Sequence, residues 1–471
     1  MKTYIIYIAL ASCILLLGLT SCEKWLDVAP QTQIEADRVF EKEAGFQDAL
    51  TGVYLKISQE SLYGRELTFG MVDGLAGQFN GQASANQYFS TITYDYDELN
   101  FIEKSKAAFG GAYNAIANLN LLIQNIDEKG PSMFTGVNYN IIRGEAYALR
   151  AFLHFDMLRL FAPSVLSQSS ASPSIPYVDA IGTLAKERLT TSVFLEKVLQ
   201  DLSVAEQALA GSDPMVPENA ANASTYLRDR QYKFNYYAVK ALQARVLLYA
   251  GRKQDALQAA NAVINSNVFE WTPSSQIANP TDPNKIFTQE LIFRLRISNL
   301  ATITAPFYDI GVSGSLLSKS PFEYQQLFDR SDYRFVYQTV LVSSLDRQYS
   351  TKLVQSASSS AAYGNQMPII RKSELFYIAA ECLMETDIAR SISYLNEVRR
   401  RRNLQDLSVA LTLTQLQSEL KMEYRREFIG EGQLFYYYKR LNAPSIDDVF
   451  VNMSDATYVL PLPDNEVSYG Q

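Results

Sequence analysis

Three glutamates recur at intervals of four residues near the C-terminal end of the chain, at Glu423, Glu427 and Glu431. Paired carboxylates do chemistry in glycoside hydrolases, where the two groups flank the bond that is cut, about 5 to 9.5 Å apart. On a helix, however, side chains four residues apart project in the same direction and cannot lie on opposite sides of a sugar. We therefore predict that the three carboxylates form a stripe on one helix face and pair with basic side chains.

Four consecutive arginines at residues 399–402 form a run of positive charge. Such a run is suited to phosphate or nucleic acid, but the formal net charge of the chain is −8, whereas nucleic-acid-binding proteins usually carry a basic surplus. The run also closes a predicted helix, where cations complement the helix dipole. A solvated or ion-paired helix end is the prediction, and no nucleic-acid partner is expected.

The chain contains one histidine, His154, among apolar residues of a predicted helix. Because zinc sites and serine-histidine-aspartate triads both depend on imidazole, neither is expected, and His154 is predicted to be a core residue. Cys382 is predicted to be a buried, unreactive thiol. No spacing of oxygen ligands indicates calcium. The sequence thus predicts no cofactor, no bound metal and no enzymatic activity.

The first residues are typical of a signal peptide, with Lys2 followed by an apolar run over residues 5–17 that is too short to span a membrane. Residues 19–22, with the sequence LTSC, look like a bacterial lipobox. Residues 1–21 are therefore predicted to be removed and Cys22 to carry acyl chains, of which more than one is needed for stable anchoring. Residues 10–13 fit the same pattern, but the apolar run before Cys13 is too short. An ordinary cysteine behind a simple signal peptide is the alternative.

The chain has 30 tyrosines and 24 phenylalanines but only 2 tryptophans. Aromatic rings stack on the apolar faces of sugars, while amide and guanidinium groups bind sugar hydroxyls; the same side chains also bind peptides. The first candidate stretch contributes Phe79, Asn80, Gln82, Asn86, Gln87, Tyr88, Tyr94 and Tyr96. The second contributes Arg294, Arg296, Phe307 and Tyr308. The shortage of tryptophan, the largest stacking ring, keeps a peptide ligand open beside a glycan.

These candidates need a scaffold, and the apolar periodicity predicts one that is mainly α-helical. Residues 234–251 and 253–264 form two amphipathic runs on either side of Gly251, with alanines on the inward faces, like a tetratricopeptide unit. Helices are also predicted over 140–161, over 190–210, and as a pair over 371–384 and 388–402. Residues 61–100, 211–228 and 272–363 are mostly irregular and rich in Gly, Asn, Ser or Pro, which favours surface loops over core.

Short motifs follow one another along most of the chain. They include WLDV at residues 25–28, FGGAYNAIAN at 109–118, GEAYALRAF at 144–152, ALQARVLLY at 241–249, LNEVR at 395–399 and LPLP at 460–463. In this order they resemble the SusD/RagB family of outer-membrane nutrient-uptake lipoproteins. Leu434 and the pair Tyr437 and Tyr438 depart from the Arg and the Asp-Leu that the family commonly has there.

The resemblance implies a SusD-like fold over residues 22–471, with an N-terminal part at about 22–210. It places tetratricopeptide-like pairs within 137–270 and 371–402, and loop-rich parts at 61–100 and 272–363. It also implies a lipid-anchored protein of the outer membrane, facing the cell surface. The helical half of such a protein packs on a SusC-like TonB-dependent transporter, and the irregular half presents a site for a glycan or a peptide.

The predicted function is therefore to bind an oligomeric nutrient, a glycan before a peptide, and to deliver it to that transporter. One alternative is a lipid-anchored glycan hydrolase or peptidase, which would release shorter products. A second alternative is a protein-only assembly scaffold of the outer membrane, which would bind no small ligand.

Overall fold

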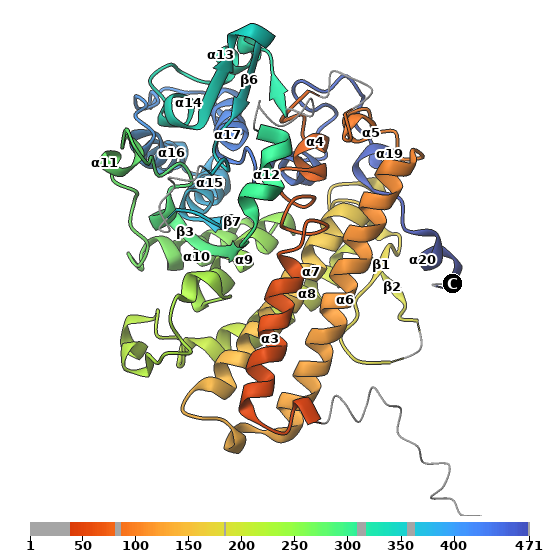
Figure 1. Ribbon diagram of the computed structural model, residues 1–471. Coiled ribbons are helices and arrows are strands. Elements are labelled where there is room, and N and C mark those ends of the chain that lie inside the picture. The colour runs from red at the N-terminus through yellow and green to blue at the C-terminus, as the bar shows by residue number, and fades with distance from the viewer. Residues whose placement is uncertain (1–37, 81–85, 183–184, 309–316, 356–362, 470–471) are drawn as a thin grey trace, which may run out of the picture.

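The computed structural model of the protein describes residues 38–80, 86–182, 185–308, 317–355 and 363–469 (Figure 1). The predicted signal peptide, the predicted anchor residue Cys22 and the candidate residue Gln82 lie outside these ranges. Over the described residues, no helix combines the length and the apolar character that crossing a membrane requires.

Long helices make up most of the first half of the chain: α3 (Glu43–Ile57), α6 (Leu99–Lys129), α7 (Asn138–Phe161) and α8 (Thr191–Ala210). Helix α6 packs against both α3 and α7, and α7 also packs against α8. Figure 1 shows α3 and α6 running alongside each other. Helix α7 carries apolar residues on nearly all of its faces. It is buried along most of its length, because other helices cover it on more than one side.

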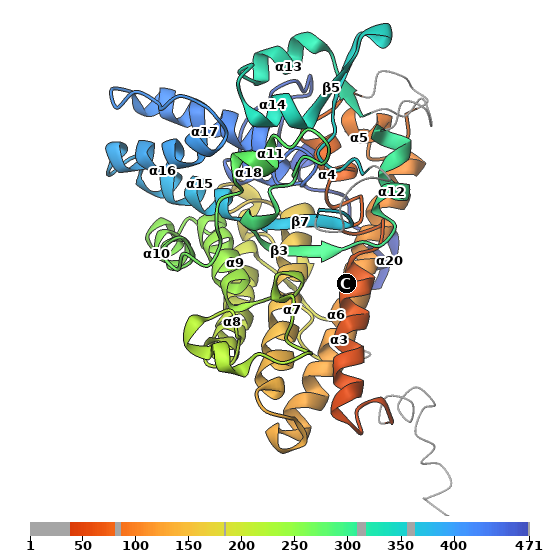
Figure 2. The ribbon, with the colours of Figure 1, turned by 60° about the vertical axis from the view of Figure 1, so that its left-hand side comes forward.

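The predicted helical pairs are confirmed. Helices α9 (Tyr236–Tyr249) and α10 (Lys253–Ile264) pack together, as do α15 (Lys372–Leu383) and α16 (Ile388–Arg401). The turn between α9 and α10 contains Gly251 at φ +75°, a conformation that side chains disfavour. Contacts between α8 and α9 and between α10 and α15 join the pairs, and Figure 2 shows α8, α9, α10, α15, α16 and α17 stacked along one side. The protein is mainly α-helical with a tetratricopeptide-like scaffold.

Shorter elements fill the rest of the described chain. The remaining α-helices are α4 (Met71–Leu75), α5 (Phe89–Ile92), α11 (Ser274–Ile277), α12 (Leu300–Tyr308), α13 (Pro321–Leu327), α14 (Tyr333–Gln338), α17 (Leu413–Glu427), α18 (Leu434–Arg440), α19 (Asp455–Tyr458) and α20 (Asp464–Tyr469). The 3-10 helices are η2 (Pro131–Met133), η3 (Gln168–Ala171), η4 (Pro217–Asn222), η5 (Arg230–Tyr232), η6 (Thr288–Glu290) and η7 (Ser343–Leu345).

Three small antiparallel sheets accompany the helices. Strand β1 (Ile175–Pro176) pairs with β2 (Arg188–Leu189), and β3 (Leu291–Arg296) pairs with β7 (Gln366–Arg371). Strand β6 (Arg347–Ser350) lies between β4 (Ser318–Lys319) and β5 (Thr339–Val342). In Figure 2, β3 and β7 lie between the helical stack and the long helices α3 and α6.

The prediction of surface loops is wrong for the beginning of the first irregular stretch. Every residue from 62 to 79 is buried except Arg65. Burial is possible because tight turns satisfy the backbone, for example through hydrogen bonds from Gly64 N–H to the Gln59 carbonyl (3.0 Å) and from Gly70 N–H to the Arg65 carbonyl (2.8 Å). Apart from the short helix α4, this stretch forms core without regular structure, which a search for helical or strand periodicity does not detect.

Asp73 joins that buried stretch to the C-terminal part of the chain. Its carboxylate accepts hydrogen bonds from the backbone N–H groups of Gly430 (2.6 Å) and Gly432 (2.9 Å). Both glycines have positive φ, and a Cβ atom at Gly432 would lie 2.4 Å from the carbonyl oxygen of Leu67. This tight turn ends α17 at Glu427. Glu431 therefore lies outside the helix, and the prediction of one continuous helical stripe of three glutamates is corrected.

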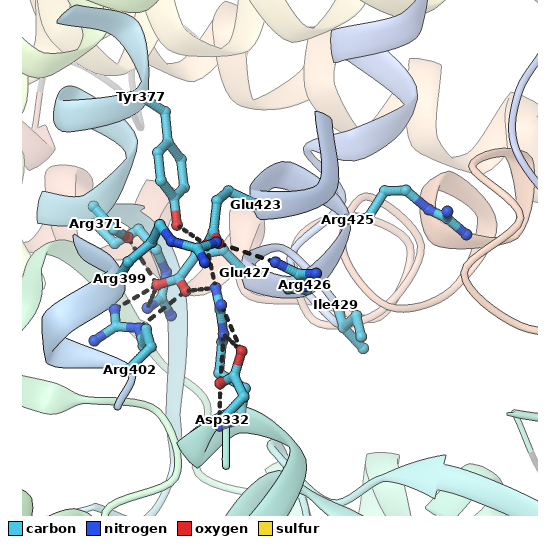
Figure 3. A network of polar contacts seen from close by, with 12 residues as sticks. Asp332, Arg371, Tyr377, Arg399, Arg402, Glu423, Arg425, Arg426, Glu427 and Ile429 are labelled. Atoms are coloured by element: carbon cyan, nitrogen blue, oxygen red, sulfur yellow. Dashed lines mark hydrogen bonds and ion pairs between the residues drawn. The ribbon is translucent and has the colours of Figure 1, made fainter. Parts of the chain in front are cut away.

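Glu427 is the centre of a buried ion-pair network (Figure 3). Its carboxylate accepts hydrogen bonds from Arg334 at 2.9 Å, from Arg371 at 3.1 Å and from Arg402 at 2.6 and 3.1 Å. Ser373 Oγ donates a further hydrogen bond at 2.8 Å. Burial acts to raise the pKa of the Glu427 carboxyl, but the three guanidinium charges outweigh it and hold that pKa well below 4.5.

The other two glutamates extend the network. Glu423 accepts hydrogen bonds from Arg334 at 2.9 Å, Arg426 at 3.1 Å and Arg399 at 3.2 Å. Burial opposes the shift, yet these arginines lower the pKa of Glu423 to about 2. Glu431 binds Arg371 Nε at 2.8 Å and Lys352 Nζ at 2.5 Å. Pairing of all three carboxylates with basic side chains is thus confirmed.

Replacing Glu427 by Gln should lower the free energy of unfolding by about 3–5 kcal/mol, because three buried guanidinium groups would lose their shared counter-charge. Glu419→Gln is the matched control, since Glu419 is 35% exposed and lies 3.5 Å from Arg399. The control should cost less than about 1 kcal/mol. Chemical denaturation of both variants measures the difference, and equal losses would contradict the central role of Glu427.

The loss of stability in acid should also differ between Glu427→Gln and the unmodified protein. Because the pKa values of Glu423 and Glu427 are lower in the folded protein than their ordinary value of 4.5, their stabilisation is complete above that pH. It is lost as the pH falls from 4.5 toward about 2. Glu427→Gln should therefore lose less stability than the unmodified protein over this range.

Candidate functional site

The carboxylates and arginines singled out by their spacing are structural. Glu423, Glu427 and Glu431 are at most 3% exposed and all are ion-paired, so they have neither the solvent contact nor the free geometry that hydrolysis requires. In the arginine run, Arg402 is buried against Glu290 and Glu427. The remaining three arginines pair with nearby acids, Arg399 with Glu419 and Glu423, Arg400 with Glu397 and Asp406, and Arg401 with Glu397. The prediction of an ion-paired helix end is confirmed.

His154 is a core residue, as predicted. Its Nδ1 donates to the Arg150 carbonyl at 3.0 Å, and its Nε2 accepts from the Val178 backbone N–H at 3.0 Å, so both nitrogens are occupied in the neutral ring. Burial, aided by the nearby charge of Arg150, lowers the pKa of His154 to about 3. Cys382 is buried too, and burial raises the pKa of its thiol to about 12. Among the described residues, no three His, Cys, Asp or Glu side chains are grouped to hold a metal ion.

The structure corrects the predicted stacking role of Phe79, Tyr88 and Tyr308. These rings are at most 5% exposed and pack in the core, where Phe79 and Tyr88 meet edge to face at 5.7 Å. The hydroxyl of Tyr88 donates to Glu66 at 3.2 Å. Phe307, weighed with the second stretch, is also buried. Rings enclosed in this way have no face to offer a sugar, so they support the loops from inside.

The other residues of the first stretch are partly engaged with neighbouring segments. Asn80 donates to Glu323 at 2.8 Å, and the side-chain oxygen of Asn86 accepts from the Tyr88 backbone at 2.9 Å. The Gln87 carbonyl accepts from Lys104 at 3.0 Å. The half-buried Tyr94 and Tyr96 donate to the carbonyls of Leu75 and Thr457. A ligand-binding role for these five side chains stays a prediction.

The second stretch places two arginines around one ring. The guanidinium carbons of Arg294 and Arg296 lie 4.6 and 4.4 Å from the centre of the Tyr232 ring, within the range of cation–π contact. Arg294 is half-buried and donates to the Thr288 carbonyl at 3.2 Å. Arg296 is exposed, and the structure shows no hydrogen bond from its guanidinium group to another described residue. The contact with the Tyr232 ring thus orients the Arg296 side chain, and the N–H groups of its guanidinium group remain open to solvent.

Arg296 lines an open groove of about 430 Å³ between the C-terminal end of α3 and the start of α12. We call this the α3–α12 groove. Its lining residues are Leu55, Ser58, Gln59, Glu60, Ser61, Arg296, Ile297, Ser298, Asn299 and Ile303. In Figure 2, β3 points toward this region beside the upper end of α3. The groove therefore brings the edge of the first irregular stretch, at Ser61, to the predicted residue Arg296.

The chemistry of the groove is that of a site for a hydroxyl-rich ligand. Buried Ile297 and Ile303 give an apolar floor, and Arg296, Gln59 and Asn299 stand exposed at its edge. The amide groups of Gln59 and Asn299 have no hydrogen-bond partner among the described residues. A volume of this size falls within the range of about 300–1,000 Å³ that is usual for ligand sites.

Sequence reasoning missed Gln59, Ser298 and Asn299. They follow the end of a helix and precede the start of another, so their own neighbours carry no aromatic or repeated pattern. The only available signal was their position beside Arg296 and beside the irregular stretch.

A second hollow lies on the helical stack. This repeat-side groove of about 700 Å³ is formed by α9, α10, α15, α17 and α18, with Leu248, Met384, Tyr437 and Leu441 among its lining residues. It lies apart from the α3–α12 groove, and no residue lines both. The smaller hollow presents free amide and guanidinium groups, whereas the larger one combines apolar and aromatic side chains with charged ones such as Lys253 and Glu381.

Two family models match the chain. One, described as starch-binding and associating with the outer membrane, covers residues 24–248, and the SusD family model covers residues 317–445. A curated relative, the SusD-like protein P2 of Formosa agariphila, is 24% identical, and the alignment covers 96% of each chain.

Solved structures share the fold. A SusD superfamily protein of Bacteroides thetaiotaomicron is 23% identical with a TM-score of 0.73, over 91% of this chain and 98% of that one. A laminarin-binding SusD-like protein is 17% identical with a TM-score of 0.68, over 91% and 98% of the two chains. Both family models, the full-length relative and the shared architecture agree, and the chain belongs to the SusD/RagB family.

Proposed function

We propose that the protein is a cell-surface lipoprotein that binds an oligomeric glycan in the α3–α12 groove and passes it to a SusC-like TonB-dependent transporter. The observation that carries the proposal is the groove itself, because its free amide and guanidinium groups suit sugar hydroxyls. The family model described as starch-binding and the laminarin-binding relative support a glycan over a peptide. Affinity in so open a site should be modest.

The transporter would dock on the helical stack. The apolar and aromatic lining of the repeat-side groove supports this side as the protein contact, since such residues are enriched at protein interfaces. The α3–α12 groove would then remain open, because it shares no lining residue with the repeat-side groove.

Calorimetric titration of the soluble form that begins at Glu23 tests the ligand. The panel should contain starch, laminarin, their oligomers and mixed peptides, with product analysis of each sample. We expect saturable heat from one class of glycan and no shorter products. Release of shorter products would favour the hydrolase or peptidase, and absence of heat from every ligand would favour the protein-only scaffold.

Replacing Arg296 by Ala should weaken glycan binding about tenfold or more, because a hydrogen bond to a charged group contributes about 1.5–3 kcal/mol. Arg390→Ala is the matched control, since Arg390 is also exposed and also lies near a tyrosine ring, 5.9 Å from the centre of Tyr394. It belongs to α16 on the helical stack and should leave affinity unchanged. Unchanged affinity of the Arg296 variant would remove the α3–α12 groove as the site.

The lipid anchor has its own test. In a Gram-negative host, Cys22→Ala should release the protein from the membrane fraction, whereas Cys13→Ala should leave it anchored. Mass spectrometry of the N-terminal peptide should find acyl chains on Cys22 in the unmodified protein and in the Cys13 variant. Loss of the anchor in the Cys13 variant instead would identify the earlier cysteine as the acylated residue.

A further inference from the structure

Four buried polar atoms near the helical stack have no hydrogen-bond partner among the described residues. They are Arg159 Nε, Arg245 Nη1 and the hydroxyl groups of Tyr249 and Tyr436. All four side chains are more than nine-tenths buried. An unpaired buried donor costs roughly 1–3 kcal/mol, so four of them in one place call for a ligand.

The four side chains line one small cavity of about 30 Å³ that adjoins the repeat-side groove. Arg159 comes from α7, Arg245 and Tyr249 from α9, and Tyr436 from α18. The guanidinium carbon of Arg159 lies 3.7 Å from the centre of the Tyr436 ring, which fixes both side chains at the cavity wall. Its volume is about twice the 10–15 Å³ that one water molecule needs.

The polar groups around this cavity are mainly donors. The side-chain acceptors of Glu374 and Gln433 are already occupied: Glu374 accepts from Arg245 at 2.6 Å through each oxygen, and the side-chain oxygen of Gln433 accepts from Arg159 at 3.0 Å. Burial raises the pKa of Tyr249, so its hydroxyl keeps its proton. The unsatisfied groups therefore all have a hydrogen to give.

The charged groups around the cavity are ion-paired. Three guanidinium groups line the cavity, those of Arg159, Arg245 and Arg440, against the one carboxylate of Glu374. Asp156 and Glu381 pair with Arg159 and Arg440 but do not line the cavity. Each guanidinium group is therefore balanced by one carboxylate, and the unpaired N–H and O–H donors, not a net charge, are what favours an anion.

We propose that this cavity binds one small inorganic anion of the size of chloride, held by the free donors of Arg159, Arg245, Tyr249 and Tyr436. A single anion in this cavity would offer a shared acceptor to these unpaired donors. Sulfate and phosphate are too large for the space. The anion would bridge α7 and α9 of the scaffold to α18.

The ion reaches the cavity from the repeat-side groove. Leu248, Tyr249, Tyr437 and Arg440 line both spaces, so the cavity opens at the inner end of the groove. Exchange with solvent through the groove makes the site accessible to soaking and to titration.

Crystals of the mature protein soaked in sodium bromide test the location directly. We expect an anomalous peak in the cavity between Arg159, Arg245 and the two tyrosine hydroxyls. Density in the cavity without an anomalous signal would identify water and overturn the proposal.

Thermal unfolding in sodium chloride and in sodium gluconate at equal ionic strength tests the energetics. Chloride should raise the Tm saturably, because it binds only the folded protein. The double variant Tyr249→Phe and Tyr436→Phe should weaken the apparent chloride affinity roughly tenfold or more. In gluconate this variant should be at least as stable as the unmodified protein, since the hydroxyls it loses have no partner.

Tyr113→Phe is the control. Its hydroxyl donates to the Pro176 carbonyl at 2.8 Å, away from the cavity, so this variant should lose stability without any change in chloride dependence. The same chloride dependence in the double variant as in the unmodified protein would overturn the proposal.

Discussion

Glu427 holds a negative charge inside the protein, and the surrounding elements are arranged to balance it. Arg334 follows the start of α14, Arg371 ends β7 and Arg402 follows α16, so one carboxylate ties together segments nearly a hundred residues apart. Removing these charges from water is costly, and they are stable together only when every partner is in place. The network therefore fixes how the helical pairs meet the loop-rich part at residues 272–363.

A second constraint acts on the first irregular part. Residues 62–79 fold into the core without a helix or strand longer than α4, and Asp73 receives two backbone N–H groups from the turn that follows Glu427. That turn needs glycine at Gly432, because a side chain there would collide with the Leu67 carbonyl. The ion-pair network and the buried loop thus meet at one short turn, which links the two halves of the chain.

This junction leaves two differently built surfaces. The α3–α12 groove lies where a helix ends and another begins, so it collects polar side chains and free amides. The repeat-side groove lies between packed helices, and its walls combine apolar and aromatic residues with charged ones such as Glu381 and Arg440. The donor-lined cavity adjoins this groove. This difference in lining supports the proposed division between ligand capture on one surface and protein contact on the other.

The sequence by itself determined the helical scaffold, because apolar residues at 3.6-residue spacing specify a buried face wherever the helix is placed. It also predicted that Glu423 and the arginine run form ion pairs, because residues of opposite charge lie nearby in the sequence. It predicted His154 and Cys382 to be core residues, because the chain has no second histidine with which they could form a site. Tertiary structure alone decided which aromatic residues are exposed. Phe79 and Tyr88 lie in a stretch whose composition is typical of a binding loop, but both rings are buried in the fold. Composition does not encode the long-range packing that buries them. The groove beside Arg296 likewise exists only because Gln59 and Asn299, 240 positions apart in the sequence, meet in the fold.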